Sequence, residues 1–257
     1  MLTTKTRASG WVCVSKYNPA AKESVEKNTP KSKGFGGLFG KGAYVEFEER
    51  PSTLNDAAAL EGRVIQKRQL LGGLFGDGAQ KYTARCTPNI LLFAKGTLET
   101  GELGITVGPA LKAALALSGG SSWTMQGVSY TATMDNDYCV GLPGGMIAKG
   151  LLESAAEKCP EAKIFTSGYS QGAMVARIAV AYANETARKQ VKGILVYGDP
   201  FNGAKVKGWD GPIKTFCRES DAVCTGAFKI GTAHLSYSLS SDVTNGLAWL
   251  IKTAKAS

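Results

Sequence analysis

The sequence predicts an α/β fold in three layers, in which helices cover both faces of a central parallel sheet. Segments typical of strands alternate with segments typical of helices, which favours parallel strands joined by helical crossovers. Several strand-like segments are continuous apolar runs, as expected of strands that are buried on both faces. The chain has 257 residues and 44% hydrophobic content, which is enough for one substantial core.

The elements follow one another in a regular order from residue 82 onward. Strands are expected where apolar residues run continuously, at residues 89–94, 128–130, 163–167, 191–197 and 214–217. Helices are expected where apolar residues recur at helical spacing, at residues 109–117, 145–158, 173–180 and 239–254. Ligands of such sheets gather at the carboxyl ends of the strands, so the residues that follow the strands are the first candidates for a site.

A G-x-S-x-G motif, Gly168-Tyr169-Ser170-Gln171-Gly172, lies between a predicted strand and a predicted helix. In that context the motif is typical of a nucleophile elbow, a tight turn that holds its serine hydroxyl exposed. Glycines are needed because larger side chains would collide with the neighbouring strand and helix. Ser170 is therefore the candidate nucleophile.

A serine hydroxyl needs a base, and the chain contains one histidine, His234. Asp221 lies between Ser170 and His234, which gives the order Ser, Asp, His found in α/β-hydrolases. Asp199 follows a strong strand and is the rival acid, although a Gly-Asp-Pro turn explains it equally well. Cysteines flank Asp221 on both sides, and a disulfide between them would fix its carboxylate. We therefore favour Asp221 as the acid.

The six cysteines form no C-x-x-C pair, and a single histidine cannot complete a usual zinc finger. We accordingly expect no metal and no organic cofactor. An even number of cysteines fits disulfides and an oxidising compartment. Asn184-Glu185-Thr186 is a glycosylation sequon, which is consistent with export.

Residues 1–68 differ in composition from the rest, and we interpret residues 1–81 as a leader or extension that precedes a catalytic domain at 82–257. The stretch 22–42 is rich in Lys, Gly and Ser and is typical of flexible chain. No secretory signal is visible at the start of the chain. Lys67-Arg68 is a dibasic pair at which a processing protease could cut.

The formal net charge is +9, but no nucleic-acid module and no basic cluster interleaved with aromatics is present. A solvated basic surface is the simpler interpretation, and we expect no nucleic-acid partner. No apolar run approaches the roughly 20 residues of a membrane-spanning helix. We expect a monomer that acts on an ester substrate.

Several of these residues together resemble the fungal cutinase family, over about residues 82–254. The resemblance rests on Gly168–Ala173, on the cysteine-bracketed segment Cys217–Gly226, on His234-Leu235 and on Phe93–Gly101. It implies an α/β-hydrolase fold and an exported serine esterase that forms an acyl-enzyme. Its substrates would be cutin, related polyesters and short to medium acyl esters.

The resemblance also assigns roles by position. It implies that the backbone N–H groups of Thr97 and Gln171 form the oxyanion hole, with the Thr97 hydroxyl contributing. It pairs Cys86 with Cys159 and Cys217 with Cys224. It makes Asn136 the match for an asparagine that braces the oxyanion residue. It places three apolar residues beside an acyl chain, with ordinary loop packing as the alternative: Phe228, Ile230 and Leu235.

Two points stay open at this stage. Cys13 and Cys139 fall outside the two implied bridges; they could pair, or Cys139 could be free or bond another molecule. The alternative activity is that of an acetylxylan esterase, which shares the elbow and fold. A catalytically inactive wall-binding protein or elicitor is the alternative of a different class.

Overall fold

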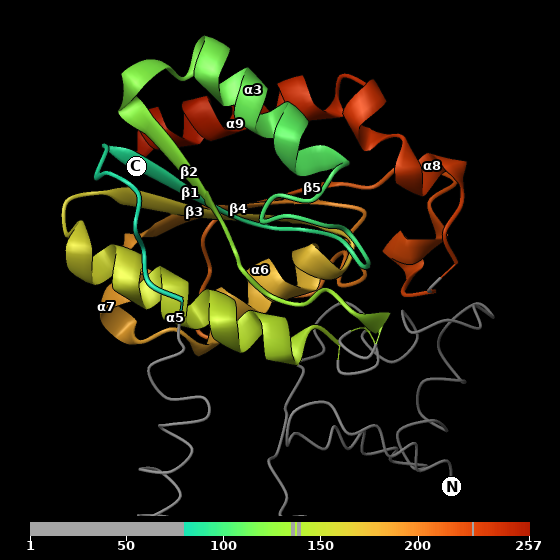
Figure 1. Ribbon diagram of the computed structural model, residues 1–257, viewed down its shortest axis with the longest axis horizontal. Helices are drawn as coiled ribbons and strands as arrows, with labels where there is room; N and C mark the ends of the chain where they lie inside the picture. The colour runs from blue at the N-terminus through green and yellow to red at the C-terminus, as the bar shows by residue number, and fades with distance from the viewer. Residues whose placement is uncertain (1–79, 135–136, 138–139, 228) are drawn as a thin grey trace, which may run out of the picture.

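Five parallel strands form one sheet in the described part of the chain, in the order β2-β1-β3-β4-β5 (Figure 1). This computed structural model describes residues 80–134, 137, 140–227 and 229–257. Residues 1–79 of the leader, which include the dibasic pair Lys67-Arg68, lie outside these residues, as do both unassigned cysteines (Cys13 and Cys139), Asn136 and Phe228. The strands are β1 (Asn89–Ala94), β2 (Trp123–Gly127), β3 (Lys163–Tyr169), β4 (Val191–Tyr197) and β5 (Ile213–Phe216).

Helices cover both faces of this sheet, as Figure 1 shows. On one face lie α3 (Val107–Ser118) and α9 (Asp242–Ala256), and on the other lie α5 (Leu142–Lys158), α6 (Gln171–Tyr182) and α7 (Glu185–Gln190). The three-layer α/β/α sandwich expected from the sequence is therefore confirmed.

The central strands are apolar because their side chains alternate between two buried layers. Every residue of β1 is buried. Leu91 and Phe93 pack with the α3 and α9 side, whereas Ile90 and Leu92 pack with the α5 and α6 side. A strand with this double burial has no polar face, which explains why its sequence is a continuous apolar run.

The expected strand at 128–130 is wrong, since β2 is Trp123–Gly127 and residues 128–130 lie beyond its end. β2 is an edge strand with two half-buried positions, so its sequence carries polar residues and lacks a strong apolar signal. Val128 lies directly after the end of β2 and is buried, which explains the apolar residue at this position. Its N–H donates to Phe93 O at 2.8 Å.

The segment after β5 is built from short turns before the last helix begins. It contains η3 (Ala222–Thr225), α8 (Thr232–Leu235) and η4 (Tyr237–Leu239), and α9 then starts at Asp242, three residues later than the start expected at residue 239. No helix in the described residues is long and apolar enough to cross a membrane.

In the described part of the chain, two disulfides anchor irregular segments. Cys86–Cys159 joins the segment before β1 to the end of α5, and Cys217–Cys224 closes a loop after β5. Both are the pairs implied by the resemblance. Asn184 of the sequon caps α7, since its side chain accepts a hydrogen bond from the N–H of Ala187.

A buried ion pair links α6 to the chain after β4. Arg177 Nε and Nη2 donate to the same Asp199 oxygen, Oδ2, at 2.8 and 2.5 Å, and Asp199 is fully buried. Asp199 Oδ1 also accepts from the N–H of Phe201 at 2.9 Å. The rival acid of the sequence analysis is therefore fully engaged in holding the fold together.

We predict that Arg177→Met destabilises the protein strongly, because the change leaves the Asp199 charge buried without its partner. The expected loss is about 3–5 kcal/mol in the free energy of unfolding, measured by urea denaturation. Lys189→Met is the matched control, since Lys189 pairs with Glu185 on an exposed helix surface. A variant at position 177 as stable as this control would contradict the prediction.

Candidate active site

Ser170 lies on a strained turn between β3 and α6. Its backbone has φ 57° and ψ −121°, a conformation that non-glycine residues rarely adopt. A Cβ atom at Gly168 would lie 2.0 Å from Gly172 O, and one at Gly172 would lie 2.0 Å from Ala94 O. Both glycines are thus required by close backbone contacts, as the elbow motif predicts.

The carboxylate of Asp221 lies against the imidazole of His234. His234 Nδ1 is 2.8 Å from Asp221 Oδ2, and both side chains are buried. Since an ionised carboxylate only accepts hydrogen bonds, this contact assigns the Nδ1 proton to His234. In the neutral ring Nε2 is then the basic nitrogen, and it has no hydrogen-bond partner among the described residues.

Asp221 also receives two further hydrogen bonds. Tyr237 OH donates to the same Oδ2 at 2.6 Å, and the N–H of Val223 donates to Oδ1 at 3.0 Å. Burial by itself raises the pKa of this carboxyl. The hydrogen bonds from His234 and Tyr237, together with the imidazole charge and the N–H of Val223, outweigh burial and hold the pKa of Asp221 below its ordinary value.

The Asp221–His234 pair lies near the elbow. Tyr169, which immediately precedes Ser170, stacks on the His234 ring with centroids 5.0 Å apart and donates from its hydroxyl to His234 O at 2.9 Å. Gly198 follows β4, the strand next to β3, and a Cβ there would lie 2.6 Å from His234 Cε1. The imidazole is therefore held at the same sheet edge as the elbow. The structure forms no hydrogen bond between His234 Nε2 and Ser170 Oγ.

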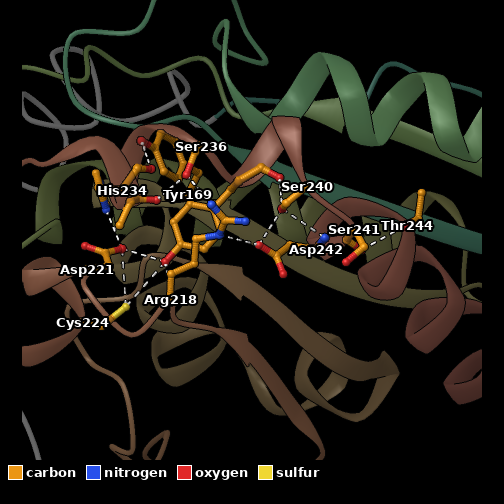
Figure 2. A network of polar contacts seen from close by, with 12 residues as sticks. Tyr169, Arg218, Asp221, Cys224, His234, Ser236, Ser240, Ser241, Asp242 and Thr244 are labelled. Atoms are coloured by element: carbon orange, nitrogen blue, oxygen red, sulfur yellow. Dashed lines mark hydrogen bonds and ion pairs between the residues drawn. The ribbon is translucent and has the colours of Figure 1, made fainter.

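A polar network holds the loop of Asp221 against the start of α9, as Figure 2 shows. Arg218 donates from Nε to Asp242 Oδ2 at 3.1 Å and from Nη1 to Ser236 Oγ. Its backbone N–H donates to Tyr237 OH at 3.2 Å, so Tyr237 bridges Arg218 and Asp221. The same loop is closed by the disulfide at Cys224, whose Sγ lies 3.6 Å from Asp221 Oδ2.

The two oxyanion candidates meet through a third residue, Asp137. Thr97 Oγ1 lies within hydrogen-bond distance of the Asp137 carboxyl group, at 2.9 Å from Oδ2 and 3.1 Å from Oδ1. Gln171 Nε2 lies 2.8 Å from Asp137 Oδ1 and 3.3 Å from Thr97 Oγ1. Gln171 is also the first residue of α6, so its backbone N–H is among those that a helix leaves without an intrahelical acceptor.

Glu99 fixes the loop that carries Thr97. Its carboxylate accepts from the N–H groups of Gly96, Ile105 and Thr106 at 2.6, 3.0 and 2.7 Å. These bonds close the loop between β1 and α3 on itself. The position of Thr97 therefore depends on hydrogen bonds within its own loop.

Two of the three apolar candidates are exposed. Ile230 is 54% exposed and Leu235 is 55% exposed, and Phe228 lies outside the described residues. Leu98 and Met134, close in sequence to Thr97 and Asp137, are also exposed.

Sequence reasoning missed three residues of this site: Tyr237, Asp137 and Glu99. Tyr237 lies three residues after His234. This spacing would place the two side chains on the same side of a helical turn, and it is the one local signal that could have indicated a role for Tyr237. Asp137 directly follows Asn136, the residue matched to the bracing position in the sequence analysis, and its contacts with Thr97 come from the structure. No group of His, Cys, Asp and Glu in the described part of the chain could hold a metal ion.

The fold and the comparisons with known proteins define a serine-dependent carboxylic ester hydrolase with an α/β-hydrolase-like fold. The chain matches the family model described as Cutinase over residues 85–254, and it belongs to the cutinase family. Cutinase 4 of Emericella nidulans is 37% identical over 169 residues, which cover 66% of this chain and 73% of that protein.

Two solved structures show the same fold at lower identity. A Trichoderma reesei cutinase in complex with a C11Y4 phosphonate inhibitor has a TM-score of 0.63 at 23% identity, covering 91% of this chain and 98% of that one. An acetylxylan esterase has a TM-score of 0.55 at 19% identity, covering 66% of this chain and 100% of that one.

We predict that Tyr237→Phe lowers kcat about tenfold and changes KM little, because a hydrogen bond to a charged group is worth about 1.5–3 kcal/mol. The variant removes one donor from Asp221 and leaves the apolar packing of the ring in place. Steady-state hydrolysis of p-nitrophenyl butyrate measures the effect.

Tyr197→Phe is the matched control for this variant. The Tyr197 side chain is equally buried, but its hydroxyl has no hydrogen-bond partner among the described residues. We expect its kcat to stay near that of the unmodified protein. Equal losses in both variants would mean that the Tyr237 hydroxyl has no special effect on Asp221.

Proposed function

We propose that this chain is a secreted cutinase-type esterase that hydrolyses cutin and short to medium acyl esters through Ser170, His234 and Asp221. The observation that carries the proposal is the buried His234–Asp221 contact at 2.8 Å, held at the sheet edge where Ser170 occupies its strained turn. Two disulfides fit an oxidising, extracellular compartment. We further propose that residues 82–257 form the catalytic domain and that the protein acts as a monomer.

In this mechanism His234 Nε2 takes the proton of the Ser170 hydroxyl as the oxygen attacks the ester carbonyl. The proton then passes to the leaving alcohol as the carbon–oxygen bond breaks, which leaves an acyl group on Ser170. A water molecule attacks this acyl-enzyme in the same way and regenerates the hydroxyl. Asp221 holds the imidazole in the required tautomer and stabilises its positive charge.

The oxyanion that develops on the carbonyl needs donors that are already in place. We assign the backbone N–H groups of Thr97 and Gln171 to this role, with the Thr97 hydroxyl as an additional donor. One such donor is worth about 3 kcal/mol in the transition state. The contacts of both side chains with Asp137 support the assignment, since they hold the two residues together.

Exposed apolar side chains favour acyl groups longer than acetate. Ile230 and Leu235 lie close in sequence to His234, and Leu98 follows Thr97 directly. Contact with an acyl chain is worth about 0.8 kcal/mol per buried methylene. We therefore assign Ile230 and Leu235, together with Phe228, to the binding of the acyl part of the substrate.

Ser170→Ala should abolish the hydrolysis of p-nitrophenyl butyrate and labelling by a fluorophosphonate, because both require the same oxygen. The thermal unfolding midpoint should stay close to that of the unmodified protein, which shows that the loss is chemical. Turnover by this variant would refute the nucleophile. An unmodified protein that resists the fluorophosphonate would instead favour an inactive binding protein.

The pH profile of kcat/KM should rise on the acid side, since the proposed general base accepts the serine proton only as a neutral imidazole. The pKa of Asp221 is held below its ordinary value, so this carboxylate stays ionised throughout that rise. The rise itself should therefore fit a single activating ionisation. A second ionisation that also raises kcat/KM with increasing pH would show that Asp221 titrates there.

A panel of p-nitrophenyl esters separates the two candidate activities. We expect kcat/KM to increase from acetate to butyrate, as contact with exposed apolar side chains predicts. Release of acyl monomers from cutin tests the polyester directly. A strong preference for acetate, together with acetate release from acetylated xylan, would favour an acetylxylan esterase.

A further inference from the structure

The carboxyl group of Asp137 lies at the oxyanion candidates, where a negative charge opposes the chemistry. The developing oxyanion is negative, and a second anion nearby raises the free energy of the transition state. Asp137 contacts both Thr97 and Gln171, and it forms no ion pair with a described Lys, Arg or His. The protonation state of Asp137 therefore affects how well these residues can bind an oxyanion.

The orientation of the Gln171 amide decides which Asp137 oxygen can carry a proton. Gln171 Nε2 donates to the backbone oxygen of Thr133 at 2.9 Å, and a backbone carbonyl can only accept. The same nitrogen donates its other hydrogen to Asp137 Oδ1 at 2.8 Å. Oδ1 is therefore committed as an acceptor, and a proton on Asp137 belongs on Oδ2.

Asp137 Oδ2 lies 2.9 Å from Thr97 Oγ1, a distance that suits a hydrogen bond in either direction. If Asp137 is ionised, the single hydroxyl hydrogen of Thr97 is donated to the carboxylate and is not available to the substrate. If Asp137 carries a proton on Oδ2, that proton is donated to Thr97 Oγ1. The Thr97 hydrogen is then free to turn toward the substrate oxygen.

We propose that Asp137 is a positioning residue whose protonation releases the Thr97 hydroxyl to the oxyanion. The proposal rests on the function proposed above, since it assumes that Thr97 and Gln171 bind the oxyanion. Burial raises the pKa of Asp137, and the hydrogen bonds from Gln171 and Thr97 lower it by less, so protonation extends to higher pH than for an ordinary aspartate.

The charged and titratable groups of the neighbouring elements are engaged elsewhere. Tyr130 OH donates to Lys95 O at 2.5 Å, and Lys95 Nζ donates to Gly101 O at 2.7 Å. Glu99 accepts three backbone N–H groups of its own loop. Among the described residues, the direct hydrogen-bond partners of the Asp137 carboxyl are thus Thr97 and Gln171.

Asp137→Asn is the decisive variant, because asparagine imitates the protonated acid. Its Oδ1 can accept from Gln171 Nε2, and its Nδ2 can donate to Thr97 Oγ1 at every pH. We expect kcat/KM of this variant for p-nitrophenyl butyrate to exceed that of the unmodified enzyme about tenfold above neutral pH. The two profiles should converge on the acid side, where both enzymes release the Thr97 hydroxyl.

Thr97→Val tests whether the gain passes through the hydroxyl. In the Asp137→Asn background this change should remove the gain, whereas in the unmodified background above neutral pH it should cost less. The two substitutions are therefore expected to be non-additive. An additive pair, or an Asp137→Asn profile lowered by the same factor at every pH, would overturn the proposal.

Rates should be expressed per active site by titration with a fluorophosphonate, so that a poorly folded fraction does not enter the comparison. The same titration distinguishes a failure of the proposed function from a failure of the proposed role of Asp137. An unmodified enzyme that is not labelled would refute the proposed function itself. A labelled enzyme whose Asp137→Asn profile runs parallel to the original would overturn the role of Asp137 alone.

Discussion

The hydrogen bond between Asp221 and His234 organises the carboxyl edge of this sheet. Burying a carboxylate is costly unless it is paired, and Asp221 is paired with an imidazole, a tyrosine hydroxyl and a backbone N–H. Each of these donors comes from a different short turn after β5. Three short turns in this region therefore surround one buried charge.

Asp199 and Asp221, the two fully buried carboxylates among the described residues, have different partners. Asp199 is neutralised by Arg177, a permanent cation, and its contacts join α6 to the end of β4. Asp221 has a partner that can gain and lose a proton. This difference in partner is the physical reason why Asp199 belongs to the framework and why Asp221 is suited to acid–base chemistry.

The geometry of the site also depends on close packing and hydrogen bonds that hold its short loops in place. Ser170 keeps an unfavourable backbone conformation because Gly168 and Gly172 allow the surrounding backbone to approach closely. Thr97 is held by Glu99 within its loop and by Asp137 across it. Helices and strands of the sandwich thus set the approximate positions, and polar contacts within loops set the final geometry.

The sequence by itself determined the alternation of strands and helices, the elbow glycines and the identity of the single imidazole. These features are local, since each follows from apolar spacing, turn chemistry or residue count. The edge strand β2 escaped prediction because a half-buried strand has a mixed composition. The flanking cysteines favoured Asp221 over Asp199 from the sequence, but only tertiary structure shows which acid meets His234, because that contact joins segments that are separate in the chain. The same holds for Tyr237 and Asp137, whose hydroxyl and carboxyl acquire a role only when folding brings Asp221, Thr97 and Gln171 within hydrogen-bond distance.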